Sequence, residues 1–432
     1  MRSKNFTLVL GLITAFSFLM PSLFGQSFST YQIITVNGGK YEFNPPYADF
    51  VTVQSTDPVS LLTTLQGTVF TQSVQDVMVN GATYFVSAGD SIVKFDGNTH
   101  QRLAATRVSG ANKLGIWQDY LLVSRQYPVT DSFLYVLSTH DLSFVKAFPE
   151  ISGESAGILC TGGRAFVAVN YGWAGTSGKI AVIDLTTLAF LSEVDLNSEG
   201  TGVYNLFQNG NQILTVNRTP WGGTSGYIST YTPLTGQVKH YLIDHVLGAG
   251  YGIFKNQLFL NIDGNIGTVD LDSYTLTNPS LIVNPVASVF GSITSAAIDT
   301  FENKIYFNAG DFFSFGQGYV YTTQGDSIGV FTSGISAEAV AIDIRSATGI
   351  NSLPNQELNL YPNPFSSFLH VNSEIPVQKI EVYLLTGEKL LSEEILGEFR
   401  ITLNTSRLRS GIYLLKIYFE NGSSVTRKII KR

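Results

Sequence analysis

The chain has 432 residues, which is long enough for two or three domains. Hydrophobic residues make up 44% of it and charged residues only 14%, with 41 Gly, 29 Phe and 21 Tyr. This composition predicts an all-β protein rather than one with long helices. Its formal charge is −7; Arg2 and Lys4 contribute +2 and residues 352–432 another +2, so residues 26–351 carry −11, which excludes nucleic acid and anionic lipid as their partners. The single cysteine, Cys160, excludes an intramolecular disulfide.

Residues 1–25 have the pattern of a secretory signal peptide. Arg2 and Lys4 precede an apolar run from Phe6 to Met20, and Gly25–Gln26 is a suitable cleavage site. The run is shorter than the ~20 residues that span a bilayer, so we expect removal, with a retained membrane anchor as the alternative. No other segment of the sequence is long and apolar enough to cross, and we expect no transmembrane segment after cleavage.

Residues 26–345 contain a repeat in which an apolar strand runs into a polar turn. Clear copies are Val93–Thr99, Val182–Thr187 and Val269–Asp272. Aligning these with four weaker copies places seven positions in register: Gln54, Asp96, Ser138, Asp184, Thr232, Asp270 and Thr322. Their intervals of 42, 42, 46, 48, 38 and 52 residues match the four-stranded blade of a β-propeller. Short polar side chains at these positions should hold the turn after each third strand.

The two ends of this region indicate closure into a ring. Residues 337–345 have the pattern of a first strand with no others after it, whereas residues 31–65 have the pattern of a blade that lacks its first strand. Joining them completes a seventh blade and removes an exposed sheet edge. We therefore predict a seven-bladed β-propeller over residues 26–345, closed by the strand 337–345, with six or eight blades as alternatives. Its strand–Asp–x–x–Thr turns, such as Ile183–Thr187, resemble those of YncE-like propellers of secreted proteins.

After a linker over residues 346–357, the sequence changes character. Alternating apolar segments with Gly turns over residues 358–432 predict a small Ig-like β-sandwich. Its motif residues, in chain order, are Tyr361, Pro362, Asn363, Pro364, Gly387, Gly411, Tyr413, Lys428 and Lys431.

These motifs, in this order, resemble the type A C-terminal sorting domain of type IX secretion cargo from Bacteroidota. The resemblance implies two partners: the export machinery that recognises the domain, and a sortase-like peptidase that cuts within residues 346–357. It also implies a secreted protein, attached to the outer-membrane surface or extracellular once the domain is removed. The alternative is a plain accessory β-sandwich.

Residues that could carry chemistry are sparse. The histidines His100, His140, His240, His245 and His370 have no metal-protease spacing. Asp270 with Asp272 lacks the remainder of a calcium loop, and Cys160 lies in an apolar strand pattern typical of a buried residue. We predict no catalytic residue, metal site or cofactor, and single out Asp343 as the one acid on a predicted inner strand.

Aromatic residues recur in loops between the second and third strands of several blades. Such loops emerge on one face of a propeller, and Tyr and Trp suit stacking on sugars, tetrapyrroles or peptide side chains. The candidate ligand-binding residues are Tyr41, Tyr47, Tyr127, Tyr171, Trp173, Arg218, Trp221, Phe312 and Phe313. The alternative is that these rings only pack the loops together.

The leading functional hypothesis is a monomeric, non-enzymatic binding module at the cell surface, used for nutrient capture or adhesion. Its ligand could be a small molecule, a glycan or a protein. A propeller enzyme, such as a metal-dependent lactonase, lyase or hydrolase, and a structural envelope protein stay open, because the fold alone does not separate these classes.

Overall fold

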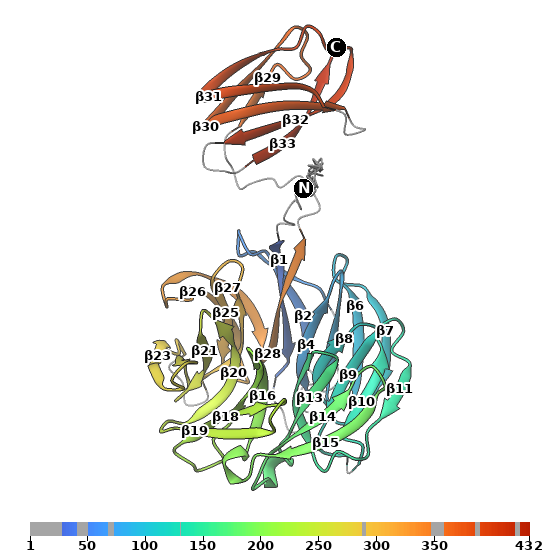
Figure 1. Ribbon diagram of the computed structural model, residues 1–432, viewed down its shortest axis with the longest axis vertical. Helices are drawn as coiled ribbons and strands as arrows, with labels where there is room; N and C mark the ends of the chain where they lie inside the picture. The colour runs from blue at the N-terminus through green and yellow to red at the C-terminus, as the bar shows by residue number, and fades with distance from the viewer. Residues whose placement is uncertain are drawn as a thin grey trace, which may run out of the picture. The chain divides into compact units, whose positions relative to one another are not determined.

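The computed structural model describes residues 28–40, 51–67, 73–129, 131–286, 291–346, 358–384, 389–419 and 424–432. They form two compact units, Phe28–Arg345 and a C-terminal unit described from Leu358 onward (Figure 1). The predicted signal peptide and residues 347–357 of the predicted linker lie outside the described residues. Within these ranges, no helix has the length and hydropathy of a membrane span.

Seven four-stranded antiparallel sheets form the first unit, which confirms the seven-bladed propeller. Six blades consist of consecutive strands, given from the innermost strand outward: β4 (Val74–Asn80), β5 (Thr83–Ala88), β6 (Ser91–Asp96), β7 (Arg102–Arg107); β8 (Ala111–Trp117), β9 (Tyr120–Arg125), β10 (Leu134–Ser138), β11 (Phe144–Ala147); β12 (Ser155–Thr161), β13 (Arg164–Val169), β14 (Lys179–Asp184), β15 (Ala189–Asp195); β16 (Val203–Asn209), β17 (Gln212–Asn217), β18 (Gly226–Thr232), β19 (Gln237–Ile243); β20 (Leu247–Phe254), β21 (Gln257–Ile262), β22 (Asn265–Asp270), β23 (Leu276–Ile282); β24 (Ser292–Asp299), β25 (Lys304–Gly310), β26 (Phe315–Thr322), β27 (Ser327–Ile335). Two short 3-10 helices, η1 (Gly172–Ala174) and η2 (Ser198–Gly200), lie in connections.

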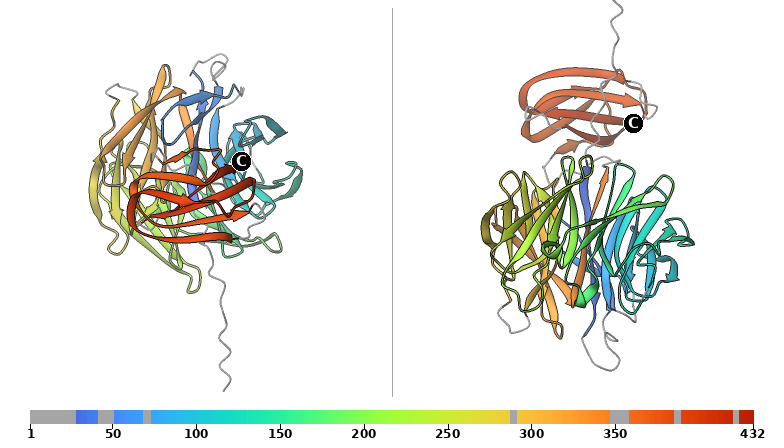
Figure 2. Two further views of the ribbon diagram at one scale, coloured as in Figure 1. Left: turned by 90° about the horizontal axis from the view of Figure 1, so that it is seen from above. Right: turned by 60° about the horizontal axis from the view of Figure 1, so that its bottom comes forward.

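The seventh blade closes the ring with strands from both ends of the unit. Its order is β28 (Ala337–Ser346), β1 (Phe28–Gly38), β2 (Val51–Thr56) and β3 (Thr63–Leu65). Figure 1 and the right view of Figure 2 show the orange β28 beside the blue β1. The predicted closure by residues 337–345 is therefore present, and β1 has no free edge on its inner side.

Polar side chains hold the turn after the third strand in most blades, as the repeat predicted, but the Thr232 side chain instead accepts a hydrogen bond from Gln212 at 3.2 Å. The carboxylate of Asp96 accepts hydrogen bonds from the amides of Asn98 and Thr99 at 2.8 and 2.7 Å, and Asp184 and Asp270 bond the same two following amides. The first copy differs, because Asp57 makes these bonds and the Gln54 side chain instead accepts from the amide of Gly334 at 3.1 Å. The alignment of the first copy was therefore wrong by three residues.

The core of the propeller lies between neighbouring blades. Leu122 and Val136 of one blade pack with Val167 and Ala181 of the next in one fully buried cluster. Alternating side chains along each strand face the two adjacent sheets, so each blade depends on both neighbours for its burial.

Asp343, the acid that the sequence placed on the closing strand, is structural. Its carboxylate is 1% exposed and accepts hydrogen bonds from Gln32 at 2.9 Å and from the Arg345 guanidinium at 2.6 Å. Arg345 also donates to the carbonyl oxygen of Gly97 in the next blade and lies over the Tyr31 ring, 3.8 Å from its centroid. The group links β28, β1 and the adjacent blade.

The C-terminal unit is one curled antiparallel sheet, which confirms the all-β expectation. Its strands are β29 (Asn359–Tyr361), β30 (Phe368–Leu384), β31 (Lys389–Asn404), β32 (Gly411–Phe419) and β33 (Ser424–Lys431). The 17-residue β30 pairs with β31 along one side and with β29 and then β32 along the other. Register shifts between Asn372 and Val377 accompany this change of partner, and the sheet surrounds a single apolar core.

A buried acid organises this unit. Glu381 is 3% exposed and accepts hydrogen bonds from Tyr383 (2.5 Å), Tyr418 (2.8 Å) and Lys389 (3.0 Å), with Lys379 at 3.3 Å. Burial alone would raise the pKa of Glu381, but these donors outweigh it and lower the pKa to about 2.

We expect Asp343→Ala to destabilise the propeller by about 2 kcal/mol, because Gln32 and Arg345 lose a buried acceptor. Urea unfolding followed by tryptophan fluorescence measures this, since all three tryptophans of the sequence, Trp117, Trp173 and Trp221, lie in the propeller. Asp244→Ala, at an exposed turn, is the control. An unchanged midpoint for the Asp343 variant would show that closure does not depend on this ion pair.

We expect Glu381→Gln to destabilise the C-terminal unit by about 1–2 kcal/mol at pH 7, a value below the full pKa shift because the lysine partners are partly exposed. The folded pKa lies below the unfolded one, so this contribution is present above about pH 4.5 and declines toward pH 2. Hydrogen exchange of β32 peptides should therefore separate the variant from wild type more at pH 7 than at pH 3. Glu394→Gln, an exposed partner of Lys379, is the control, and an equal effect from it would refute the special role of Glu381.

Candidate functional site

A pocket of about 960 Å³, here called the rim pocket, lies at one face of the propeller. The β9–β10, β13–β14 and β17–β18 connections of three consecutive blades line it. Five of the nine candidate ligand-binding residues meet there: Tyr127, Tyr171, Trp173, Arg218 and Trp221.

Two exposed tryptophans mark the mouth of the rim pocket. Trp173 is 88% and Trp221 is 90% exposed, and their ring centroids lie 6.3 Å apart with the planes inclined by 35°. Leaving two indole rings in water forgoes the stabilisation that burial provides, and exposed aromatic groups of this kind are typical of binding surfaces.

The local backbone holds Trp173 outward. Tyr171 and Gly172 both have positive φ, 57° and 64°, and the amide of Gly172 donates to the Asn170 side chain at 3.0 Å. The φ of Gly172 strains any residue with a side chain, and a Cβ there would also have to displace the Glu154 carboxylate, 2.5 Å away. This tight bend places the next residue, Trp173, in η1 at the surface.

Arg218 and Tyr204 form the floor of the rim pocket. The guanidinium carbon of Arg218 lies 3.2 Å from the centroid of the Tyr204 ring, a cation–π contact. The Nε atom of Arg218 is buried and has no hydrogen-bond partner among the described residues. Tyr204 also lines the space on the other side of this floor, as does Arg218.

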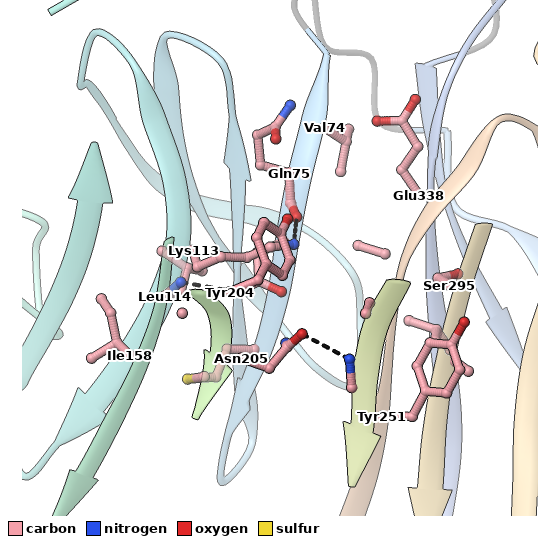
Figure 3. Close-up of a pocket in the computed structure, with 18 of the residues that line it drawn as sticks. Val74, Gln75, Lys113, Leu114, Ile158, Tyr204, Asn205, Tyr251, Ser295 and Glu338 are labelled. Carbon is pink, nitrogen blue, oxygen red and sulfur yellow. Dashed lines mark hydrogen bonds between the residues drawn. The ribbon is translucent and has the colours of Figure 1, made fainter. Parts of the chain in front are cut away.

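That second space, the central channel, has a volume of about 390 Å³ and is lined by the innermost strands of all seven blades. Figure 3 shows Lys113 beside the Tyr204 ring, with Glu338 farther across the channel. Asp76 accepts a hydrogen bond from the amide of Leu114 at 2.9 Å, and Lys113 donates to the carbonyl oxygen of Gln75.

Burial and charge compete in the channel. Burial raises the pKa of Asp76 and of Glu338 although Lys113 opposes the shift at both. At Tyr204 burial would also raise the pKa, but the charges of Lys113 and Arg218 lower it overall. Two cations, Lys113 and Arg218, therefore face Tyr204 on this wall and are opposed by the acid Asp76.

These channel residues were not among the candidates predicted from the sequence. Asp343, the acid it singled out, does not line the channel, whereas Asp76 and Glu338 do. The available signal was an acidic residue among apolar residues of a first strand, as with Asp76 between Val74 and Val77 and Glu338 between Ala337 and Ala339.

The other candidates lie elsewhere. Tyr41 and Tyr47 are outside the described residues. Phe312 and Phe313 follow β25, where Asp311 accepts a hydrogen bond from the Phe313 amide at 2.9 Å, and neither residue lines the rim pocket. Among the residues that the structure describes, no three His, Cys, Asp or Glu side chains are placed to hold a metal ion. Cys160 is half-buried, and burial raises its pKa to about 12.

Motif residues from the beginning of the C-terminal unit contact its last strand. Asn363 donates to the carbonyl oxygen of Lys428 at 3.2 Å and accepts from the amide of Ile430 at 2.9 Å. Lys431 donates to the carbonyl oxygen of Thr405 at 3.0 Å.

The remaining motif residues are distributed around this contact. Tyr361 is the last residue of β29 and precedes the Pro362–Pro364 turn. Gly411 pairs with Lys431 in the sheet, and the Tyr413 hydroxyl donates a hydrogen bond to the carbonyl oxygen of Arg409. Gly387 lies outside the described residues.

Comparison with known proteins identifies the C-terminal unit. Residues 359–432 match the family described as the secretion system C-terminal sorting domain. No curated protein matches the sequence.

Several solved structures resemble this chain at low sequence identity. A protein of unknown function from Desulfotomaculum acetoxidans is 13% identical with a TM-score of 0.53, over 72% of this chain and 99% of that one. The extracellular domain of a one-component system from B. thetaiotaomicron is 11% identical with a TM-score of 0.48, over 92% and 57%. The dihydro-heme d1 dehydrogenase NirN is 10% identical with a TM-score of 0.46, over 72% and 75%. These likenesses concern the fold alone. The chain is thus a seven-bladed β-propeller followed by a type IX secretion C-terminal sorting domain, and it is exported to the cell surface or the extracellular space.

Proposed function

We propose that the propeller is a binding module displayed at the cell surface, for ligand capture or adhesion, and that the rim pocket is its site. The observation that carries this proposal is the pair of exposed rings, Trp173 and Trp221, at the mouth of a pocket. The volume of about 960 Å³ lies within the usual range for ligand sites, roughly 300–1,000 Å³.

The alternatives place function elsewhere in the molecule. A lactonase, lyase or hydrolase would use the titratable groups of the central channel, chiefly Asp76, Lys113 and Tyr204. Asp76 and Lys113 already bond to backbone groups there, whereas the Trp rings present their surface to solvent. If the protein is instead a structural component of the envelope, a partner would cover these rings. A screen for ligands separates that case from ligand capture.

For the C-terminal unit, we propose that the export machinery recognises the surface around Asn363, Lys428 and Lys431. A sortase-like peptidase then cuts within residues 346–357. The support is the contact between the Tyr361–Phe365 motif and the last strand, which presents both motifs on one part of the unit.

Changing Trp173 and Trp221 together to Ala should weaken ligand binding about a hundredfold without unfolding the propeller, because both rings are exposed. Thermal-shift and pull-down screens with corrinoids, haem, glycans and divalent metals would identify a ligand of the wild-type chain, and titration would compare the variants. Leu234→Ala, which removes an exposed apolar side chain at another turn, is the control. Equal affinity in the folded double variant would eliminate the rim pocket as the site.

Deleting residues 352–432 should leave a folded propeller in the periplasm, because the export signal is removed while the first unit keeps its own core. Protease accessibility on whole cells, compared with the wild-type chain, reports the location. Surface exposure of the truncated protein at wild-type levels would contradict the sorting assignment.

A further inference from the structure

The Arg218 guanidinium, which has one unsatisfied donor among the described residues, lines the rim pocket together with the exposed tryptophans. The Arg218 guanidinium rests on Tyr204, and its Nε has no hydrogen-bond partner in the described part of the chain. A buried donor without an acceptor costs stability, and a charged donor costs more than a neutral one. The position therefore suits an acceptor that arrives with a ligand.

The surroundings favour an anion at this position. Lys113 lies on the channel side, with its Nζ 5.7 Å from the centroid of the same Tyr204 ring. The acid that lines the rim pocket, Glu154, accepts a hydrogen bond from the Tyr127 amide at 3.0 Å, and on the channel side Asp76 opposes the effect of the two cations on Tyr204. Two cations thus converge on one ring within a propeller region whose sequence carries a net negative charge. A ligand carboxylate would form charge-assisted hydrogen bonds with the guanidinium.

The rest of the pocket favours a hydroxylated ring. Besides the two tryptophans, its lining includes the neutral hydrogen-bonding side chains of Gln126, Asn170, Thr201 and Thr219. A pyranose ring combines an apolar C–H face, which stacks on indole, with hydroxyl groups that bond such side chains. Asn170 and Thr219 each accept one amide hydrogen bond within the chain, and a purely apolar aromatic ligand would leave their remaining hydrogen-bonding capacity unused.

We infer that the rim pocket binds an acidic saccharide, with a uronic acid carboxylate on Arg218 and a sugar ring on Trp173 and Trp221. This inference rests on the proposed function, since it names the ligand class of the same pocket.

The test is calorimetric titration of the chain from Gln26 to Arg432 with trimers of galacturonate and of mannuronate, and with their methyl esters. The esters keep the sugar rings and lose the charge. At least one acidic trimer should bind, and its ester should bind at least about tenfold more weakly.

Arg218→Met should remove the preference for the acid, because the variant keeps an apolar side chain over Tyr204 and loses the charge. The Trp173→Ala, Trp221→Ala double variant should weaken acid and ester alike. Arg102→Met, which removes the same charge from the outer strand β7, is the matched control and should retain the preference. Tryptophan fluorescence and the melting temperature would verify that the Met variants are folded.

Equal affinity for acid and ester, or an acid preference that survives in Arg218→Met, would overturn the acidic class while leaving the rim pocket as a binding site. Absence of binding by every acidic trimer would also overturn it, and the broader ligand screen would then decide the proposed function separately.

Discussion

Pairing of β28 with β1 joins the two ends of the propeller sequence within one blade, and the other six blades depend on this closure for burial on both faces. Each blade packs on its neighbours through alternating apolar side chains, so an open ring would expose two apolar sheet faces. Asp343 also stabilises this closure, because its buried carboxylate accepts hydrogen bonds from Gln32 of β1 and from Arg345. Arg345 in turn donates a hydrogen bond to the carbonyl oxygen of Gly97 in the next blade. The loops that carry Trp173 and Trp221 keep their separation only while the ring holds adjacent blades in place.

The ring also explains how a cationic site can exist in an acidic protein. Lys113 comes from β8, whereas Tyr204 comes from β16 and Arg218 from the loop after β17 of the same blade, so two blades distant in sequence converge at one wall. Burial weakens ionisation there, yet the two cations lower the pKa of Tyr204 below its ordinary value. The negative charges of the propeller lie largely in turns, where Asp96, Asp184 and Asp270 bond backbone amides. The net charge of the propeller and the electrostatic potential at this wall therefore differ, because different residues of the sequence form the turns and the channel.

The sorting domain is stabilised in a different way. It has no ring to close, and its long β30 instead changes partner from β29 to β32 as the sheet curls around one core. Glu381 supports this arrangement from within the sheet through bonds to residues on β30, β31 and β32. The Asn363 contacts then bring the first motif against the last strand, so that motifs about 65 residues apart share one surface.

The sequence by itself determined the blade period, the closing strand, the polar turns and the sorting domain, because strand alternation and turn chemistry act over a few residues. It could not determine which loops meet: Tyr127, Tyr171, Trp173, Arg218 and Trp221 share a pocket, whereas Phe312 and Phe313 do not line it. Nor could it identify the channel groups, since it singled out Asp343 and missed Glu338, five residues earlier on the same strand. An odd separation places two side chains on opposite faces of a strand, and only the packing of the blades decides which face meets the channel. The blade repeat and the sorting motifs are thus local properties of the chain, whereas the site is a property of the tertiary structure.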